Sequence, residues 1–172
     1  MPIRDLLLPE FDHEVANTRR LLERVPEDRP DFRPHEKSMT LAQLAGHLAA
    51  LPHWAIFALT RTELDLAPRD GSGKPPELDP PPMTSRATLL EAFDSVTRDV
   101  RSRLTEVLDD ELMQKWTLRK GGHVVFTLPR ISVIRLLCFN HAIHHRAQLG
   151  VYLRLNDVPL PPVYGPTADA DL

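Results

Sequence analysis

The sequence predicts an all-α protein, a four-helix bundle with long connections and a short extended segment before the last helix. Two observations support this fold class. Apolar residues recur at spacings of three and four in four separate stretches, and most of the 17 prolines fall between or after those stretches. The 172 residues fit a single domain spanning 1–172, and a hydrophobic content of 42% is enough to form its core.

The first helix is expected from Pro9 to Val25. Pro9 suits a first helical turn, because its missing N–H would have no partner there in any case. A turn of helix before it, over 3–8, is left open. The inward face of this helix is expected to carry Phe11, Val15, Thr18 and Leu22.

The second helix is expected to begin at Ser38 or Thr40, since both residue types make good N-caps. Pro52 lies inside its apolar pattern and should bend the helix rather than end it, because the pattern continues to Phe57. A stretch rich in proline and glycine follows at 67–82. Its composition predicts an irregular surface loop within the same domain.

The third helix should follow Thr84 and Ser85, and it has the cleanest apolar stripe in the chain. That stripe consists of Leu89, Phe93, Val96, Val100, Leu104 and Val107.

The segment 116–128 contains a Gly-Gly pair and a β-branched run, which predict a short hairpin or an extended crossover. The fourth helix is expected from near Pro129 to about Asn156. The tail, 157–172, is rich in proline and should lie extended over the bundle or over a partner.

The composition disfavours several classes of function. A net charge of −3 and scattered Lys and Arg residues argue against a nucleic-acid partner. The single cysteine, Cys138, excludes an internal disulfide and suits a reducing cytoplasm. The first residues lack a signal-peptide pattern, and no run approaches the ~20 apolar residues that span a bilayer. We therefore expect a cytoplasmic protein without a membrane partner.

Two histidines in the last helix suggest a metal site. His141 and His145 are four residues apart, so they lie one turn apart on one helix face, together with Gln148 and Tyr152. That spacing alone is equally compatible with two core histidines that bond to neighbouring groups. A shared metal would satisfy both imidazoles at once.

A third ligand would have to come from another helix, and His47 is the best candidate. It lies on the apolar stripe of the second helix, where a lone histidine is more often a core residue bonded to a carbonyl. Its combination with the pair favours a ligand. His144 is the main rival to His145, and Cys138 could approach the metal but more readily packs as a small hydrophobic residue. Neutral imidazoles suit zinc, nickel, iron or copper.

The sequence resembles the DinB/YfiT-like family of metal-binding helical bundles over nearly its whole length. The resemblance is carried by FDHEVANTRRLLERVPED near the start, by RPHEKSMTLAQLAGHLAALPHWA, and by HAIHHRAQLGVYLRLNDVPLPPVYGPTAD near the end. His47, His141 and His145 match the family's three metal positions, and this match selects His145 over His144. The motif HHRAQ has Ala147 where the family more often has glycine.

The resemblance implies one divalent cation, zinc or nickel above all, and a homodimer. It also implies a small-molecule substrate and a low-molecular-weight thiol, as in thiol-dependent transferases of the family. Three protein ligands leave a coordination position open, so the metal could activate a thiol or a water molecule in a transferase or hydrolase. Gln148 and Tyr152 would then contact the substrate. The alternative is a non-catalytic bundle whose metal is structural or supports a dimer.

Overall fold

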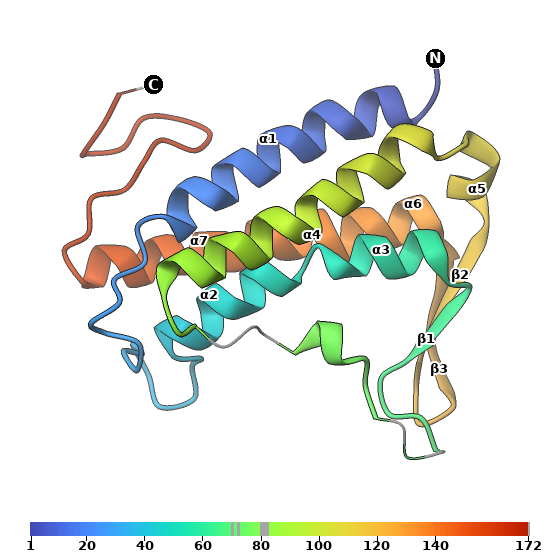
Figure 1. Ribbon diagram of the computed structural model, residues 1–172, viewed down its shortest axis with the longest axis horizontal. Coiled ribbons are helices and arrows are strands. Elements are labelled where there is room, and N and C mark those ends of the chain that lie inside the picture. Colours follow the sequence, from blue (N-terminus) through green and yellow to red (C-terminus); the bar gives the residue numbers. More distant parts are fainter. Residues whose placement is uncertain (70, 72, 80–82, 172) are drawn as a thin grey trace.

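A computed structural model describes residues 1–69, 71, 73–79 and 83–171 of the chain (Figure 1). Helices make up most of it, and a small three-stranded sheet is added to them. The helical elements are α1 (Arg4–Leu22), α2 (Leu41–Ala50), α3 (His53–Thr60), the 3₁₀ turn η1 (Pro76–Leu78), α4 (Arg86–Glu106), α5 (Asp109–Met113), α6 (Arg130–Val133), the π-helix η2 (Ile134–Asn140) and α7 (His141–Leu155). The strands are β1 (Glu63–Asp65), β2 (Lys115–Lys120) and β3 (His123–Pro129).

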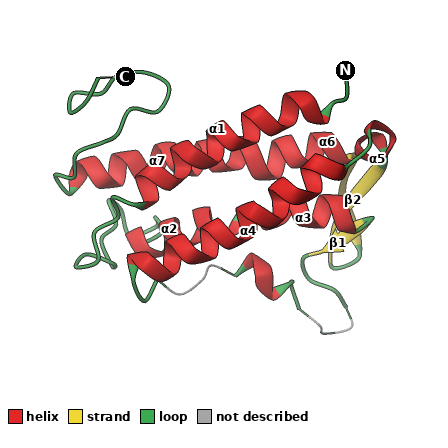
Figure 2. Ribbon diagram, turned by 45° about the horizontal axis from the view of Figure 1, so that its top comes forward, coloured by secondary structure: helices red, strands yellow, loops and turns green. Residues whose placement is uncertain are grey.

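The long helices pack around one core. Helix α1 contacts α4 and α7, and α2 contacts the same two helices, so these four elements enclose the buried apolar side chains. The views in Figures 1 and 2 show the sheet at one end of the helices and the C-terminal tail toward the other. The expectation of an all-α fold is therefore corrected to a mostly helical fold with a small sheet. The expected count of four helices also understates the division of the chain, because α2 and α3 are separate and α5 is an additional short helix.

Helix α1 begins earlier than predicted. It starts at Arg4, so Pro9 lies inside the helix and the expectation of a first-turn proline is wrong. The backbone N–H of Ile3 donates to the Asp109 carboxylate at 2.8 Å, and Leu7 is only 2% exposed. Burial of that apolar turn extends the helix ahead of the proline, although Pro9 has no N–H to donate to the preceding turn.

Helix α2 begins as predicted after Thr40, whose hydroxyl accepts the N–H of Gln43 at 3.2 Å while the Gln43 side chain accepts the N–H of Thr40 at 2.9 Å. This is a complete capping box. The helix is interrupted at Leu51 and Pro52, which keep right-handed helical dihedral angles, and α3 resumes at His53. The expectation of one bent helix is therefore corrected to two helices, although the chain stays in helical conformation through Pro52.

Helix α4 matches its prediction closely. Ser85 caps it by accepting the N–H of Thr88 at 3.1 Å, and all five stripe residues inside the helix, together with Val107 at its end, are buried. The predicted surface loop at 67–82 precedes it. Positions 70, 72 and 80–82 lie outside the described residues, and the rest of the loop contains turns and the short η1.

The predicted hairpin is present and belongs to the sheet, in which β2 pairs antiparallel with β3 and parallel with β1. Gly121 and Gly122 form its turn with φ values of +62° and +79°, a conformation that glycine adopts without strain. The Asp65 carboxylate at the end of β1 accepts both of their N–H groups, at 2.9 and 2.7 Å. Buried Trp116 of β2 donates its indole N–H to the Phe57 carbonyl at 3.2 Å, which ties the sheet to α3.

The last predicted helix is continuous from Arg130 to Leu155, but after its first turn it is the π-helix η2 before it becomes the α-helix α7. A π segment of this kind changes the rotation of the helix, and such segments are frequent at functional sites. The tail beyond it folds back over its own chain, where Asp169 pairs with Arg154 of α7 and also accepts the N–H of Leu160 at 2.9 Å. Across the described residues, no helix has both the length and the apolar character that a membrane crossing requires.

Candidate metal centre

The structure brings together the three histidines that the sequence singled out. His47 comes from α2 and the other two from α7, and their ligand atoms all lie within 4.8 Å of one another. The Nε2 atom of His141 is 3.4 Å from Nε2 of His47 and 2.9 Å from Nε2 of His145. Two nitrogens that each lie roughly 2.0–2.1 Å from a tetrahedral zinc ion are about 3.3 Å apart. The observed separations are therefore close to those of metal ligands.

The positions follow from the two helices. His141 opens α7 directly after the π-helix, and His145 follows one turn later on the same face. Helix α2 packs against α7 and presents His47 to this face. All three rings are partly buried.

Each of these imidazoles is held in its neutral form. Burial lowers the pKa of His47 to about 4, with further lowering by the neighbouring His145 and His141. Burial also lowers the pKa values of His141 and His145, and His144 adds to both effects. A histidine must be neutral to bind a metal, so this environment prepares the three rings for that role near neutral pH.

Gln148 determines the tautomer of His145. Nδ1 of His145 lies 2.7 Å from Oε1 of Gln148, and this amide oxygen can only accept, so Nδ1 carries the proton. The lone pair of Nε2 then faces the other two histidines. The Gln148 amide nitrogen in turn lies 3.1 Å from Nε2 of His144, which is exposed and outside the cluster. Gln148 thus orients the His145 ring in the way that outer partners of metal ligands do.

His141 lacks such a partner. Its Nδ1 atom is buried and makes no hydrogen bond of normal geometry, although the Leu137 carbonyl acts to raise the pKa of the ring. Three neutral imidazoles whose Nε2 atoms converge cannot all satisfy one another, because each hydrogen bond between them uses one proton and one lone pair. A cation that accepts all three lone pairs resolves this conflict.

A pocket of about 500 Å³ adjoins the cluster. It is lined by His145, Gln148 and Tyr152 of α7 and by Lys37, Ser38 and Met39 of the segment before α2. Tyr152 is buried and donates its hydroxyl to the Met39 carbonyl at 3.0 Å, which ties these two parts of the lining together. Gln148 and Tyr152 therefore both line the pocket, as their shared face suggested, and contact with a substrate stays a prediction.

The remaining candidates lie elsewhere. Cys138 is buried, and burial raises the pKa of its thiol to about 12, which agrees with its interpretation as a packed hydrophobic residue. His53 donates from Nδ1 to the Ala50 carbonyl at 3.1 Å. His13 and His35 are exposed, as expected, and so is His123.

Sequence reasoning missed the residues on the other side of α7. Arg146, directly after His145, is 3% exposed and pairs with the Glu14 carboxylate of α1 at 2.6 Å. One signal was available, because Glu14 falls on the face of α1 that also buries Phe11 and Thr18. The contribution of Tyr164, which reaches this pair from the tail, had no signal in the sequence.

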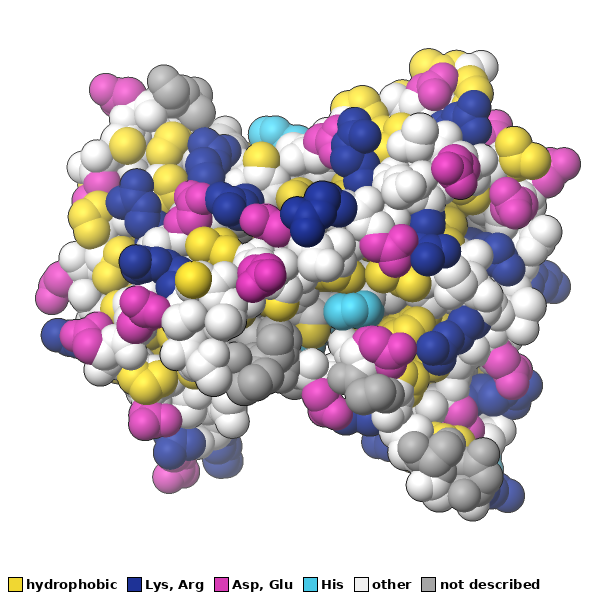
Figure 3. All heavy atoms as spheres, viewed as in Figure 1, with side chains coloured by type: hydrophobic (Ala, Val, Ile, Leu, Met, Phe, Trp, Pro, Cys, Tyr) yellow, Lys and Arg dark blue, Asp and Glu magenta, His cyan; other side chains and the backbone are white. Residues whose placement is uncertain are grey.

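The surface shown in Figure 3 carries interspersed basic and acidic side chains rather than one basic area. This face offers no continuous stripe for a phosphate backbone, in keeping with the scattered charges of the sequence.

Comparison with known proteins identifies the family. The model of the DinB superfamily matches residues 10–149. A crystal structure of a DinB-like protein from Bacillus cereus is similar, with a TM-score of 0.66 and 22% identity over 91% of this chain and 95% of that one. A DinB-like protein from Bacillus subtilis has a TM-score of 0.67 and 19% identity over 92% and 97%. At these identities the two structures show a shared fold.

No curated protein matches this sequence, so the assignment depends on the family model and on the fold. The family model covers most of the chain, including His47, His141 and His145. This protein belongs to the DinB superfamily.

Proposed function

We propose that this protein binds one divalent cation through His47, His141 and His145 and uses it to activate a thiol or a water molecule, as a thiol-dependent transferase or a hydrolase. The observation that carries the proposal is the convergence of the three Nε2 atoms, with separations of 2.9 and 3.4 Å at His141. Zinc and nickel both suit a set of neutral imidazoles.

An open coordination position supports a catalytic rather than a structural role. Within the described part of the chain, the cluster contains these three histidines and no fourth His, Cys, Asp or Glu. Structural zinc sites have four protein ligands, whereas catalytic sites keep a position for water or substrate. The pocket lined by His145 places space for a small molecule next to one of the three ligands.

A cation held in this way lowers the pKa of a bound thiol or water molecule and so supplies thiolate or hydroxide near neutral pH. The chain's own residues would do the rest. Gln148 keeps His145 in the required tautomer, and Tyr152 holds the Met39 wall of the pocket in place. Lys37 and Ser38 provide a cation and a hydroxyl for polar groups of the substrate, while Val151 offers an apolar surface.

Metal analysis tests the proposal directly. Wild-type protein, purified without chelators or a nickel column, should contain stoichiometric metal, and H141A should contain almost none. H53A is the matched control, because His53 lies on the neighbouring α3 and contacts the Ala50 carbonyl instead of the cluster. Stoichiometric metal in H141A would overturn the assignment of the ligands.

A cobalt-substituted protein then distinguishes catalysis from a structural metal. Addition of a small thiol, such as glutathione or 2-mercaptoethanol, should change the visible absorption of cobalt, because the thiolate enters the open position. A spectrum that stays constant with every thiol tested would favour the non-catalytic alternative. Protein that responds should next be screened for transfer of thiols to electrophilic small molecules.

A further inference from the structure

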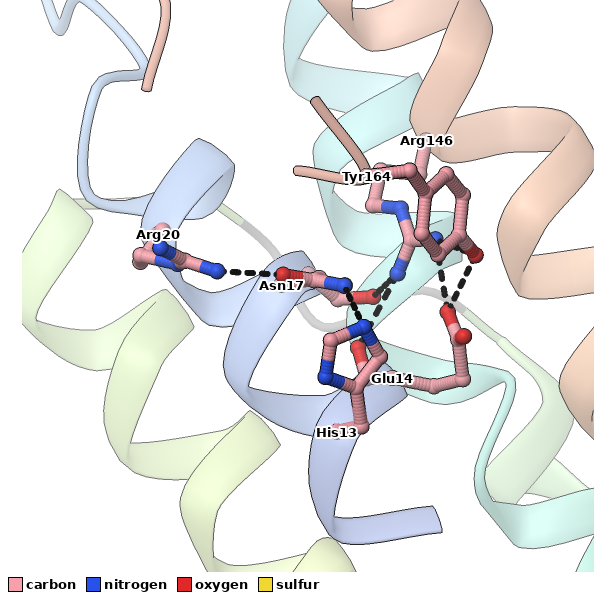
Figure 4. Close-up of polar contacts among 7 residues, drawn as sticks. His13, Glu14, Asn17, Arg20, Arg146 and Tyr164 are labelled. Carbon is pink, nitrogen blue, oxygen red and sulfur yellow. Dashed lines mark hydrogen bonds and ion pairs between the residues drawn. The ribbon is translucent and has the colours of Figure 1, made fainter. Parts of the chain in front are cut away.

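A buried polar cluster surrounds Arg146, which projects from α7 about 100° around the helix from His145, and Figure 4 shows this cluster. At its centre the Arg146 guanidinium donates from Nη1 to the Glu14 carbonyl at 3.1 Å and to the Thr18 hydroxyl at 3.2 Å. From Nη2 it donates to the Glu14 carboxylate at 2.6 Å and to the Tyr164 hydroxyl. The Tyr164 hydroxyl donates to the same carboxylate at 2.7 Å.

The cluster joins three parts of the chain that are far apart in sequence. Glu14 and Thr18 belong to α1, Arg146 to α7 and Tyr164 to the C-terminal tail. The Arg146 guanidinium lies over the Tyr164 ring, 5.1 Å from its centroid, and the centroid of the His13 ring is 6.0 Å from that of Tyr164. The tail thereby covers the ion pair, and the side chains of Arg146 and Glu14 are only 3% and 11% exposed.

Such a pair fixes geometry more than it adds net stability, because the cost of desolvating two charges offsets most of their attraction. Here the geometry concerns the rotation of α7 about its own axis. Arg146 is the residue next to His145, so anchoring Arg146 to α1 determines the direction in which His145 and His141 project.

A small rotation would have a large effect on the metal site. The ligand nitrogens of a helical histidine lie about 6 Å from the helix axis, so a rotation of 10° would displace them by about 1 Å. Metal–ligand distances tolerate deviations of only about 0.2 Å. The rotation of α7 about its axis therefore has to be fixed by contacts other than those of the ligands themselves.

We propose that Arg146 is a positioning residue of the metal centre and that Glu14 and Tyr164 complete this support, so that the C-terminal tail contributes to metal affinity from outside the site. The inference rests on the proposed metal binding. It differs from it because the residues tested, Glu14 and Tyr164, bond to Arg146 and to each other rather than to a metal.

The test measures zinc affinity by competition with a chelator, together with the visible spectrum of the cobalt-substituted protein. E14Q should weaken zinc binding roughly 10–100-fold, as the loss of outer support for ligands commonly does. Y164F removes one hydroxyl and should weaken it roughly 2–10-fold. Both variants should shift the cobalt spectrum, because the ligand geometry relaxes.

V100A is the matched control, since Val100 is a fully buried residue of α4 outside the cluster. It should lower thermal stability without changing zinc affinity or the cobalt spectrum. If E14Q and Y164F behave like V100A, the cluster is purely structural and the inference is overturned. If the wild type itself binds no zinc, the proposed function fails, and this inference fails with it. Y164F is mild enough to fold, so the test does not depend on E14Q.

Discussion

The polar groups around Arg146 and those around His145 differ in whether the chain itself supplies all their bonding partners. On one side, the guanidinium of Arg146 meets a carboxylate, two hydroxyls and a carbonyl, and every one of these partners belongs to the chain itself. On the other side, the imidazoles of His47, His141 and His145 direct the same kind of atom, Nε2, toward one another. Adjacent residues, Arg146 and His145, thus belong to a complete network and to an incomplete one. Polar groups that satisfy each other hold a structure together, whereas polar groups that converge without a counterpart indicate a ligand.

The largest effect is expected from a change in the hydrogen-bonded network around Arg146. R146M leaves the Glu14 carboxylate buried without its partner, and the free energy of unfolding should fall by about 3–5 kcal/mol. Urea unfolding measures this loss. The double variant E14L/R146M, which removes both charges, should recover most of it. A double variant as unstable as R146M would mean that the network contributes more than a compensated ion pair.

The three histidines should add to the stability of the protein only when they bind a metal ion. Zinc at about a hundredfold above its Kd should raise the free energy of unfolding by about 2.7 kcal/mol, because the folded state binds the ion and the unfolded chain binds it far less. Thermal unfolding with and without zinc, followed by addition of EDTA, measures this gain. H47A should show none of it. Equal stabilisation of H47A would place the zinc ion elsewhere on the protein.

The partner of His145 should matter for the metal and little for the fold. Q148L removes the acceptor of the His145 Nδ1 proton and should weaken zinc binding roughly 10–100-fold. The control Q114L changes an exposed glutamine at the end of α5 and should bind zinc as the wild type does. Wild-type affinity in Q148L would show that the tautomer of His145 is fixed by other means.

A separate effect is expected from pH in the metal-free protein. The pKa of His47 is lowered from 6.5 to about 4, so the unfolded chain binds a proton in this range that the folded chain does not. The contribution of His47 to the free energy of unfolding is therefore fully present above about pH 6.5, and it is lost as the pH falls toward about 4. H47Q should reduce this loss, and urea unfolding across the range measures it. A wild type whose stability is independent of pH here would contradict the neutral state of the ring.

The sequence predicted the long helices and the three histidines because both depend on local periodicity. The stripe from Leu89 to Val107 and the spacing of His141 and His145 are properties of a helix, whatever it packs against. The start of α1 was missed, because burial of Leu7 and the contact of Ile3 with Asp109 are tertiary effects that override the preference of Pro9 for a first turn.

Other features depend on contacts that no local pattern contains. Strand β1 is only three residues long and exists because it pairs with β2. The role of Gln148 as the partner of His145 follows from side-chain geometry, and the tail residue Tyr164 reaches Glu14 across 150 positions of the chain. Of the site, the sequence therefore predicted the ligand candidates but not the residues that hold them in place.

The π-helix before His141 allows a single helix to serve two neighbours with different angular requirements. At its beginning, Arg130 must point toward α3, where it donates to the carbonyls of Leu59 and Arg61 at 3.2 and 3.4 Å. At its end, the histidines must point toward α2. A regular α-helix formed by the same residues would turn one end against the other by about 100°, because a π turn contains one residue more than an α turn. The π-helix thus accommodates one additional residue while both ends keep their alignment with α3 and α2.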